Sequence, residues 1–253
     1  MGKLTNQFQD GEKIFDMLSK KADNKLLSSS AQLGLDKFVF ERHNNYVMTF
    51  YDTVDNLLTS TGILLYRTQE NGKFYFKVEK LNFLPNVRKL HKAPIFEHEV
   101  TAKDTPSSVA FYIINGISQL FSTQFFIDLE HVVKVAVPKL EIEIQGTEYK
   151  GFSGNGFKCA VEFQNLRYRN FVTRKKHKNF EAVITHTSSK HFEKDFEEFL
   201  ERVEKYCKEL LPKTLTRYDY GNNVTKILEK KPREKKRNKE KEKERKVENT
   251  IQG

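Results

Sequence analysis

Charged residues recur at every second position in several segments of this chain of 253 residues. This spacing places side chains on one face of a β-strand, and examples are Glu141 with Glu143 and Arg167 with Arg169. Where such faces enclose a channel, Lys and Arg bind phosphate oxygens, and carboxylates hold Mg²⁺ or Mn²⁺, which polarises phosphorus and orients water. The pattern therefore favours triphosphate chemistry, and its plainer alternative is a sheet with one solvated face.

Lys77 is the strongest single candidate for binding an anion. Its neighbours along the strand are apolar and face the other way, so its ammonium must reach either solvent or an anion. The predicted phosphate-binding residues are Lys77, Arg67, Arg167, Arg169 and Lys80. The predicted metal ligands are Glu141, Glu143, Glu162 and Glu181. Asp52, at a strand end, is a candidate for catalysis, but a short polar residue there is more often a turn or cap group, and it is interpreted as one.

The sequence signatures of several common enzyme classes are absent. The chain has no GxGxxG, GxxxxGK[ST], HExxH or GxSxG motif. Cys159 and Cys207 have no zinc-ligand spacing and cannot form a disulfide framework. The motifs therefore leave the alternating charges as the main functional signal, and no catalytic residue is assigned.

Most of the net charge of +10 belongs to the C-terminal end of the chain. The segment 229–246 has 11 Lys or Arg against five Glu and has no apolar residue to bury. We expect residues 224–253 to form a disordered basic tail, which could contact RNA or another polyanion by releasing counterions. No apolar segment is long enough to span a membrane, and Met1 to Gln7 lacks a signal peptide, so a cytoplasmic protein is expected.

The predicted elements indicate one domain, residues 1–223, of mainly antiparallel strands. Asn71-Gly72 predicts a tight hairpin because both residues tolerate a positive φ. The predicted strands are 38–43, 46–51, 62–69, 73–81, 132–137, 140–148, 157–168 and 180–187. The predicted helices are 12–19, 106–121 and 191–211. This order predicts an α+β fold with an antiparallel eight-stranded, tunnel-like β-barrel and flanking helices.

The segment 49–80, TFYDTVDNLLTSTGILLYRTQENGKFYFKVEK, resembles the CYTH, or triphosphate tunnel metalloenzyme, superfamily. The residues that match its pattern are Tyr51, Asp52, Thr53, Asp55, Leu57, Gly62, Arg67 and Lys77. LTRYDYG, residues 215–221, is similar to the SKY ending of the superfamily. The resemblance implies an eight-stranded barrel, a divalent ion, and a substrate such as ATP, thiamine triphosphate, inorganic triphosphate or an RNA 5′ end.

The sequence also departs from the superfamily pattern. Residues 2–8, GKLTNQF, have no carboxylate where the superfamily has an ExExK strand, and Leu65 occupies the place of a second arginine. The late ExE strand corresponds either to Glu141 with Glu143 or, by order along the chain, to the segment 180–187, which offers only Glu181.

Three hypotheses follow. The first is a triphosphate phosphohydrolase dependent on Mg²⁺ or Mn²⁺, of the RNA 5′-triphosphatase, inorganic or thiamine triphosphatase, or adenylate cyclase-like kind. The second is an inactive tunnel that binds a nucleotide or polyphosphate. The third is a scaffold whose basic tail docks RNA or an acidic protein surface. The sequence does not specify the oligomeric state.

Overall fold

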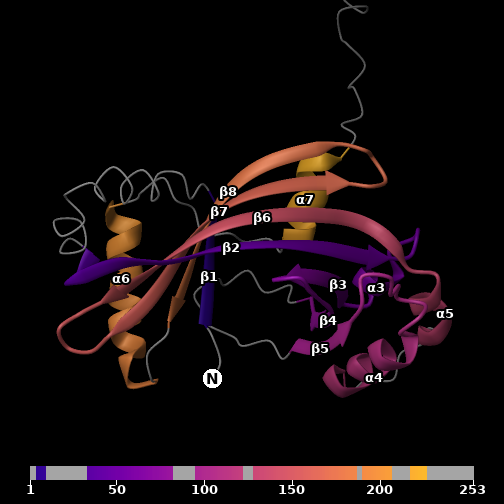
Figure 1. Cartoon of the computed structure of the whole chain (residues 1–253), viewed down its shortest axis with the longest axis horizontal. Helices are drawn as coiled ribbons and strands as arrows, with labels where there is room; N and C mark the ends of the chain where they lie inside the picture. Colours follow the sequence, from indigo (N-terminus) through magenta and orange to yellow (C-terminus); the bar gives the residue numbers. More distant parts are fainter. Residues whose placement is uncertain are drawn as a thin grey trace, which may run out of the picture.

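Eight strands form one antiparallel sheet in the order β1-β8-β7-β6-β2-β3-β4-β5 (Figure 1). The structure, a computed structural model, describes residues 33–81, 95–121, 128–186, 190–206 and 217–226, together with the backbone of 4–9. The strands are β1 (Leu4–Gln9), β2 (Lys37–Asp52), β3 (Ile63–Glu70), β4 (Lys73–Lys80), β5 (Ile95–Val100), β6 (Val137–Phe152), β7 (Lys158–Asn170) and β8 (Lys176–His186).

The α+β prediction is confirmed, but the closed barrel is not. Among the described residues, β1 pairs only with β8 and β5 pairs only with β4, so the sheet has two ends. The long strands β2, β6, β7 and β8 arch over the shorter β3, β4 and β5 (Figure 1). The sheet therefore has an inner, concave face and an outer face.

Helices cover different parts of the two faces (Figure 1). On the outer face, α4 (Ala110–Leu120) and α5 (Leu129–Lys134) enclose one apolar core with β3 and β4, and α6 (Glu193–Tyr206) encloses a second with β7 and β8. On the inner face, α7 (Arg217–Thr225) contacts β6, β7 and β8, and its Tyr218 joins a third core. Gly221 permits this close contact, because a Cβ there would lie 2.5 Å from Leu140.

β2 changes faces at Glu41. Phe40 pairs with Tyr149 and Arg42 pairs with Glu148, so Glu41 is an extra residue in the ladder. Because the side-chain period of a strand is two, one extra residue moves every following side chain to the opposite face. The two strands predicted over 38–43 and 46–51 are thus one bent strand.

Of residues 132–137, predicted as a strand, 132–134 lie in helix α5 and only 137 is extended, at the start of β6. The prediction was wrong because the valine-rich composition favours strands, whereas Asp128 starts a helix here: its carboxylate accepts a hydrogen bond from the His131 amide at 3.1 Å. The Asn71-Gly72 hairpin is confirmed, with φ of 51° and 79°.

The remaining helix predictions are tested only in part. The predicted helix 106–121 corresponds to α4. The predicted helix 191–211 corresponds to a 3₁₀ turn, Lys190–Phe192, and α6 within the described residues. The predicted helix 12–19 and nearly all of the predicted tail lie outside them, and α7 continues to Thr225. None of the described helices is long and apolar enough to cross a membrane.

Candidate functional site

A cavity of about 590 Å³ lies on the inner face of the sheet. Side chains from β2, β3, β4 and α7 line it, including the aromatic rings of Tyr46, Phe50, Tyr66 and Tyr218. Its charged lining residues are Arg42, Glu70, Lys77, Glu79, Lys80 and Arg217. Cations therefore outnumber carboxylates by four to two at the cavity wall.

Arg217, the first residue of α7, lies at the junction of this helix with the sheet, and its side chain is 11% exposed. Its Nε donates to Glu181 Oε2 at 3.3 Å, one Nη donates to the Tyr46 hydroxyl at 3.2 Å, and the other donates to Gln164 Oε1. Tyr168 donates to the second oxygen of Glu181 at 3.2 Å. Burial lowers the pKa of Arg217, but Tyr46 and Glu181 outweigh it and the pKa is raised, so the guanidinium stays charged.

Lys77 projects from β4 onto the inner face beside Tyr66. Its ammonium lies 2.9 Å from Glu97 and 3.5 Å from Glu70. Burial lowers the pKa of Lys77, but the two carboxylates outweigh it and the pKa is raised. The Lys77 side chain is 16% exposed, whereas those of Glu70 and Glu97 are 42% and 47% exposed. Lys77 is thus a charged group at the cavity wall whose partners reach solvent.

Tyr66 and Glu79 form a second polar pair at the cavity. The Tyr66 hydroxyl donates a hydrogen bond to the Glu79 carboxylate. Burial raises the pKa of Glu79, against the opposing effects of the Tyr66 hydrogen bond and the Lys77 charge. This pair places a carboxylate, rather than another cation, two residues from Lys77 on the same face of β4.

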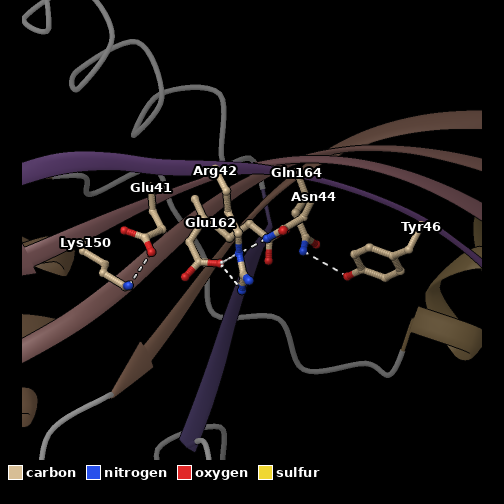
Figure 2. A network of polar contacts seen from close by, with 8 residues as sticks. Glu41, Arg42, Asn44, Tyr46, Lys150, Glu162 and Gln164 are labelled. Atoms are coloured by element: carbon tan, nitrogen blue, oxygen red, sulfur yellow. Dashed lines mark hydrogen bonds and ion pairs between the residues drawn. The ribbon is translucent and has the colours of Figure 1, made fainter. Parts of the chain in front are cut away.

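A polar network extends from the cavity along β2, β6 and β7 (Figure 2). The Asn44 amide donates to Glu148 at 3.1 Å and to Glu162 at 3.2 Å, and Arg42 donates to Glu148 at 2.9 Å. Burial raises the pKa of Glu162, although hydrogen bonds from Asn44 and Gln164 oppose it. Gly146 leaves room for this carboxylate, because a Cβ there would lie 2.1 Å from Glu162 Oε1.

The five predicted phosphate-binding residues do not gather in one place. Lys77 projects into the cavity. Lys80 lies at the edge of the cavity, but it pairs with Ile63 of the outer core, and its ammonium lies 5.1 Å from the centre of the Phe121 ring. Arg67 lies on the outer face, where its Nη1 donates at 3.3 Å to the carbonyls of Ala102 and Asp104 before α4. Arg167 and Arg169 also project from the outer face, beside Glu143 and Glu141 respectively.

The four predicted metal ligands are divided between the two faces of the sheet. Glu141 and Glu143 lie on the outer face, whereas Glu162 and Glu181 lie on the inner face. Glu162 accepts from Asn44, and Glu181 is buried against Arg217. Within the described ranges, no three His, Cys, Asp or Glu side chains are grouped to hold a metal ion. These residues do not fit the divalent site that the superfamily resemblance implies.

Asp52 is a structural residue, as expected. Its carboxylate is buried and accepts from the amides of Thr53, Leu58 and Thr59 at 2.7, 2.9 and 3.1 Å. These bonds hold the short helix α3 (Leu57–Ser60) after β2. A buried acid with this many backbone donors serves as a cap.

The sequence interpretation missed Arg217, Glu97 and Glu79 as site residues. Arg217 lies in LTRYDYG, the segment similar to the SKY ending, and this similarity was the available signal. Glu97 alternates with Glu99 in a segment that no predicted strand covered, although it forms β5.

Comparisons with known proteins support the fold. No family model matches the chain, and no curated protein is similar enough in sequence to be matched. A solved structure from Hippeastrum, of a protein proposed to be an adenylyl cyclase and described as having a dominant triphosphatase activity, is 13% identical. The match covers 90% of this chain and 98% of that one, with a TM-score of 0.52.

Two further solved structures are similar over comparable lengths. One, from Bacillus halodurans and proposed to be an adenylate cyclase, is 12% identical and covers 87% of this chain and 98% of its own, with a TM-score of 0.48. One from Pyrococcus horikoshii is 14% identical and covers 86% and 95%, with a TM-score of 0.40. The similarity to the Hippeastrum structure therefore shows a shared fold.

Proposed function

We propose that this protein binds a triphosphate-containing compound, such as ATP or inorganic triphosphate, in the inner cavity and does not hydrolyse it by a metal-dependent route. One observation carries the proposal: cations outnumber carboxylates among the residues that line a cavity of about 590 Å³, and Lys77 of β4 faces it. This volume is within the range of small-molecule sites. Its aromatic lining offers faces on which a nucleobase can stack.

Lys77 is the residue best placed to exchange its present partners for phosphate. Its two carboxylate partners are half exposed, and ion pairs of this kind contribute only about 0–1 kcal/mol. A phosphate group presents more negative charge and more acceptor oxygens than either carboxylate. Arg217, by contrast, is engaged by buried groups, and we assign it to holding the cavity wall.

The arrangement of carboxylates supports binding without turnover. The four predicted ligands are divided between two faces, and β1 has no carboxylate in Leu4–Gln9. Metal-dependent phosphoryl chemistry needs hard oxygen ligands converging on one ion. The inner carboxylates Glu162 and Glu181 instead accept hydrogen bonds from the protein itself.

The test is calorimetric binding of ATP and of inorganic triphosphate, with Mg²⁺ or with EDTA, together with an assay for released phosphate. The wild type is compared with Lys77→Ala and with the control Lys134→Ala, another lysine paired to a glutamate but located on α5. We expect binding in EDTA, at least tenfold weaker binding by Lys77→Ala, unchanged binding by Lys134→Ala, and no release of phosphate.

Two results would contradict the proposal. Phosphate release that requires metal and is lost in Lys77→Ala would establish an enzyme. If the wild type does not bind either compound, or if the two variants lose equal affinity, the cavity is excluded as the binding site.

A further inference from the structure

The outer surface of β7 and β8 carries a group of cations that the inner cavity does not use. The segment 165–180, which forms the end of β7, the turn and the start of β8, contains six Lys or Arg and no Asp or Glu. Arg167 pairs across the strands with Lys178, and Arg169 with Lys176. All four are exposed on the same face, and we call them the outer basic face.

The neighbouring carboxylates neutralise this face only in part. Glu141 lies 3.7 Å from Arg169, and Glu143 lies 3.8 Å from Arg167, both from β6. The two arginine side chains remain 55% and 57% exposed. Exposed pairs at such distances contribute little free energy, so two weakly held carboxylates face four cations.

An exposed aromatic ring continues the outer basic face along β8. Phe180 follows Lys178 by two residues, lies on the same face and is 41% exposed. Further along the strand, Ile184 is buried in the core beneath α6. Phe180 therefore stands at the border between the covered and the uncovered part of this surface.

Protection of a sheet edge does not account for the arrangement. Lysines on an edge strand discourage pairing with another chain, and the described part of β1 pairs with β8 only from Glu181 onward. Arg167 and Arg169, however, lie on β7, which is paired on both sides. Their charge calls for another explanation.

We propose that the outer basic face binds single-stranded nucleic acid, with the four cations at backbone phosphates and Phe180 stacked on a base. Alternate residues of a strand are about 6.6 Å apart, so the cations form two rows that an extended sugar-phosphate backbone can follow. Cations that track the backbone, with an aromatic ring for the bases, are the usual elements of such sites. The site is separate from the inner cavity and does not depend on its ligand.

The test is fluorescence anisotropy of a labelled uridine dodecamer with a 5′ hydroxyl, titrated with the full chain at several salt concentrations. The absence of a 5′ triphosphate keeps the result independent of the cavity. Replacing Arg167, Arg169, Lys176 and Lys178 by Ala is expected to weaken binding at least tenfold and to reduce the salt slope by about 2.8. The matched control replaces four exposed lysines on other elements, Lys37, Lys73, Lys103 and Lys194.

A second pair of variants tests stacking. Phe180→Ala should weaken binding at least about fivefold, whereas Phe111→Ala, which removes an exposed ring on α4, should not. If the fourfold variant unfolds, as judged by circular dichroism, the double variant Arg167→Gln with Arg169→Gln takes its place.

Three outcomes would overturn the proposal. If the quadruple variant and its control lose equal affinity for RNA, binding depends on the net charge of the chain, including that of the basic tail, and not on this face. Unchanged RNA binding by the variant with all four substitutions would exclude the outer basic face as the binding site. Displacement of the RNA by polyglutamate as effectively as by unlabelled RNA would indicate an acidic protein as the partner.

Discussion

The cations on the inner and outer faces of β6, β7 and β8 differ in their exposure and in how closely carboxylates pair with them. On the inner face, the Arg217 side chain is only 11% exposed and donates hydrogen bonds to Glu181, Tyr46 and Gln164. On the outer face, Arg167 and Arg169 are exposed and lie 3.7–3.8 Å from their carboxylates. The inner cation is committed to the fold, whereas the outer cations remain available to a partner.

This difference shows that residue type and spacing do not by themselves assign a function. Glu162 and Arg167 are five positions apart on one strand and lie on opposite faces of the sheet. A strand with period two supplies one set of side chains to each side. Which set meets a cavity depends on the register of the sheet and on the helices that cover each face.

The largest expected effect is on the inner face. Arg217→Ala should lower the free energy of unfolding by about 3–5 kcal/mol, because it leaves the buried Glu181 carboxylate without its cation. Urea denaturation measures this loss. Arg217→Lys, which keeps the charge but not the fork of donors, should lose less. A loss below about 1 kcal/mol for Arg217→Ala would mean that the inner cation is not committed to the fold.

A smaller effect on the free energy of unfolding, one that depends on pH, should come from substituting Glu162. Since burial raises its pKa, the folded protein binds this proton more tightly than the unfolded chain does, and the charged form costs stability above the raised pKa. Glu162→Gln should therefore be more stable than the wild type near pH 8. Its advantage should shrink as pH falls through the raised pKa and should vanish below about 4.3, the ordinary value for Glu.

The difference in the free energy of unfolding between the wild type and Glu162→Gln is measured by urea denaturation across this pH range. Other carboxylates titrate in both chains and cancel in the difference. A difference that does not vary with pH, or one that grows on acidification, would show that the Glu162 carboxylate is not held in a desolvated position.

The smallest effect should be on the outer face. Arg167→Ala together with Arg169→Ala should change the free energy of unfolding by less than about 1 kcal/mol, because exposed ion pairs contribute little. The same urea assay applies. A loss comparable with that of Arg217→Ala would erase the distinction between the two faces.

Local features of the sequence predicted part of this molecule correctly. Asn71-Gly72 specified its turn, because the required positive φ is a property of those two residues. The alternation of residue types also put Lys77 on the face of its strand opposite Phe76 and Val78, because side chains alternate along a strand. Both predictions depend on no more than a few adjacent residues.

The rest depended on contacts between distant segments. Arg217 reaches Tyr46 across 171 positions of the chain, and no local pattern encodes such a distance. The division of Glu141 and Glu162 between two faces follows from the pairing of β6 with β7. Valines at 132–137 favour a strand by propensity, but an upstream cap and packing against α4 select a helix.

The extra residue at Glu41 in β2 has a consequence for how this chain can diverge. Phe38 and Tyr46 both occupy even positions, yet the first packs beneath α6 and the second lines the cavity. If one codon were lost at this position, a single alternation would run through all of β2. The side chains of one half would then move to the opposite face of the sheet, so that either apolar residues lose their core or polar residues enter it. Insertions and deletions should therefore be rarer here than substitutions, and they should accumulate instead in the exposed turn at 154–156.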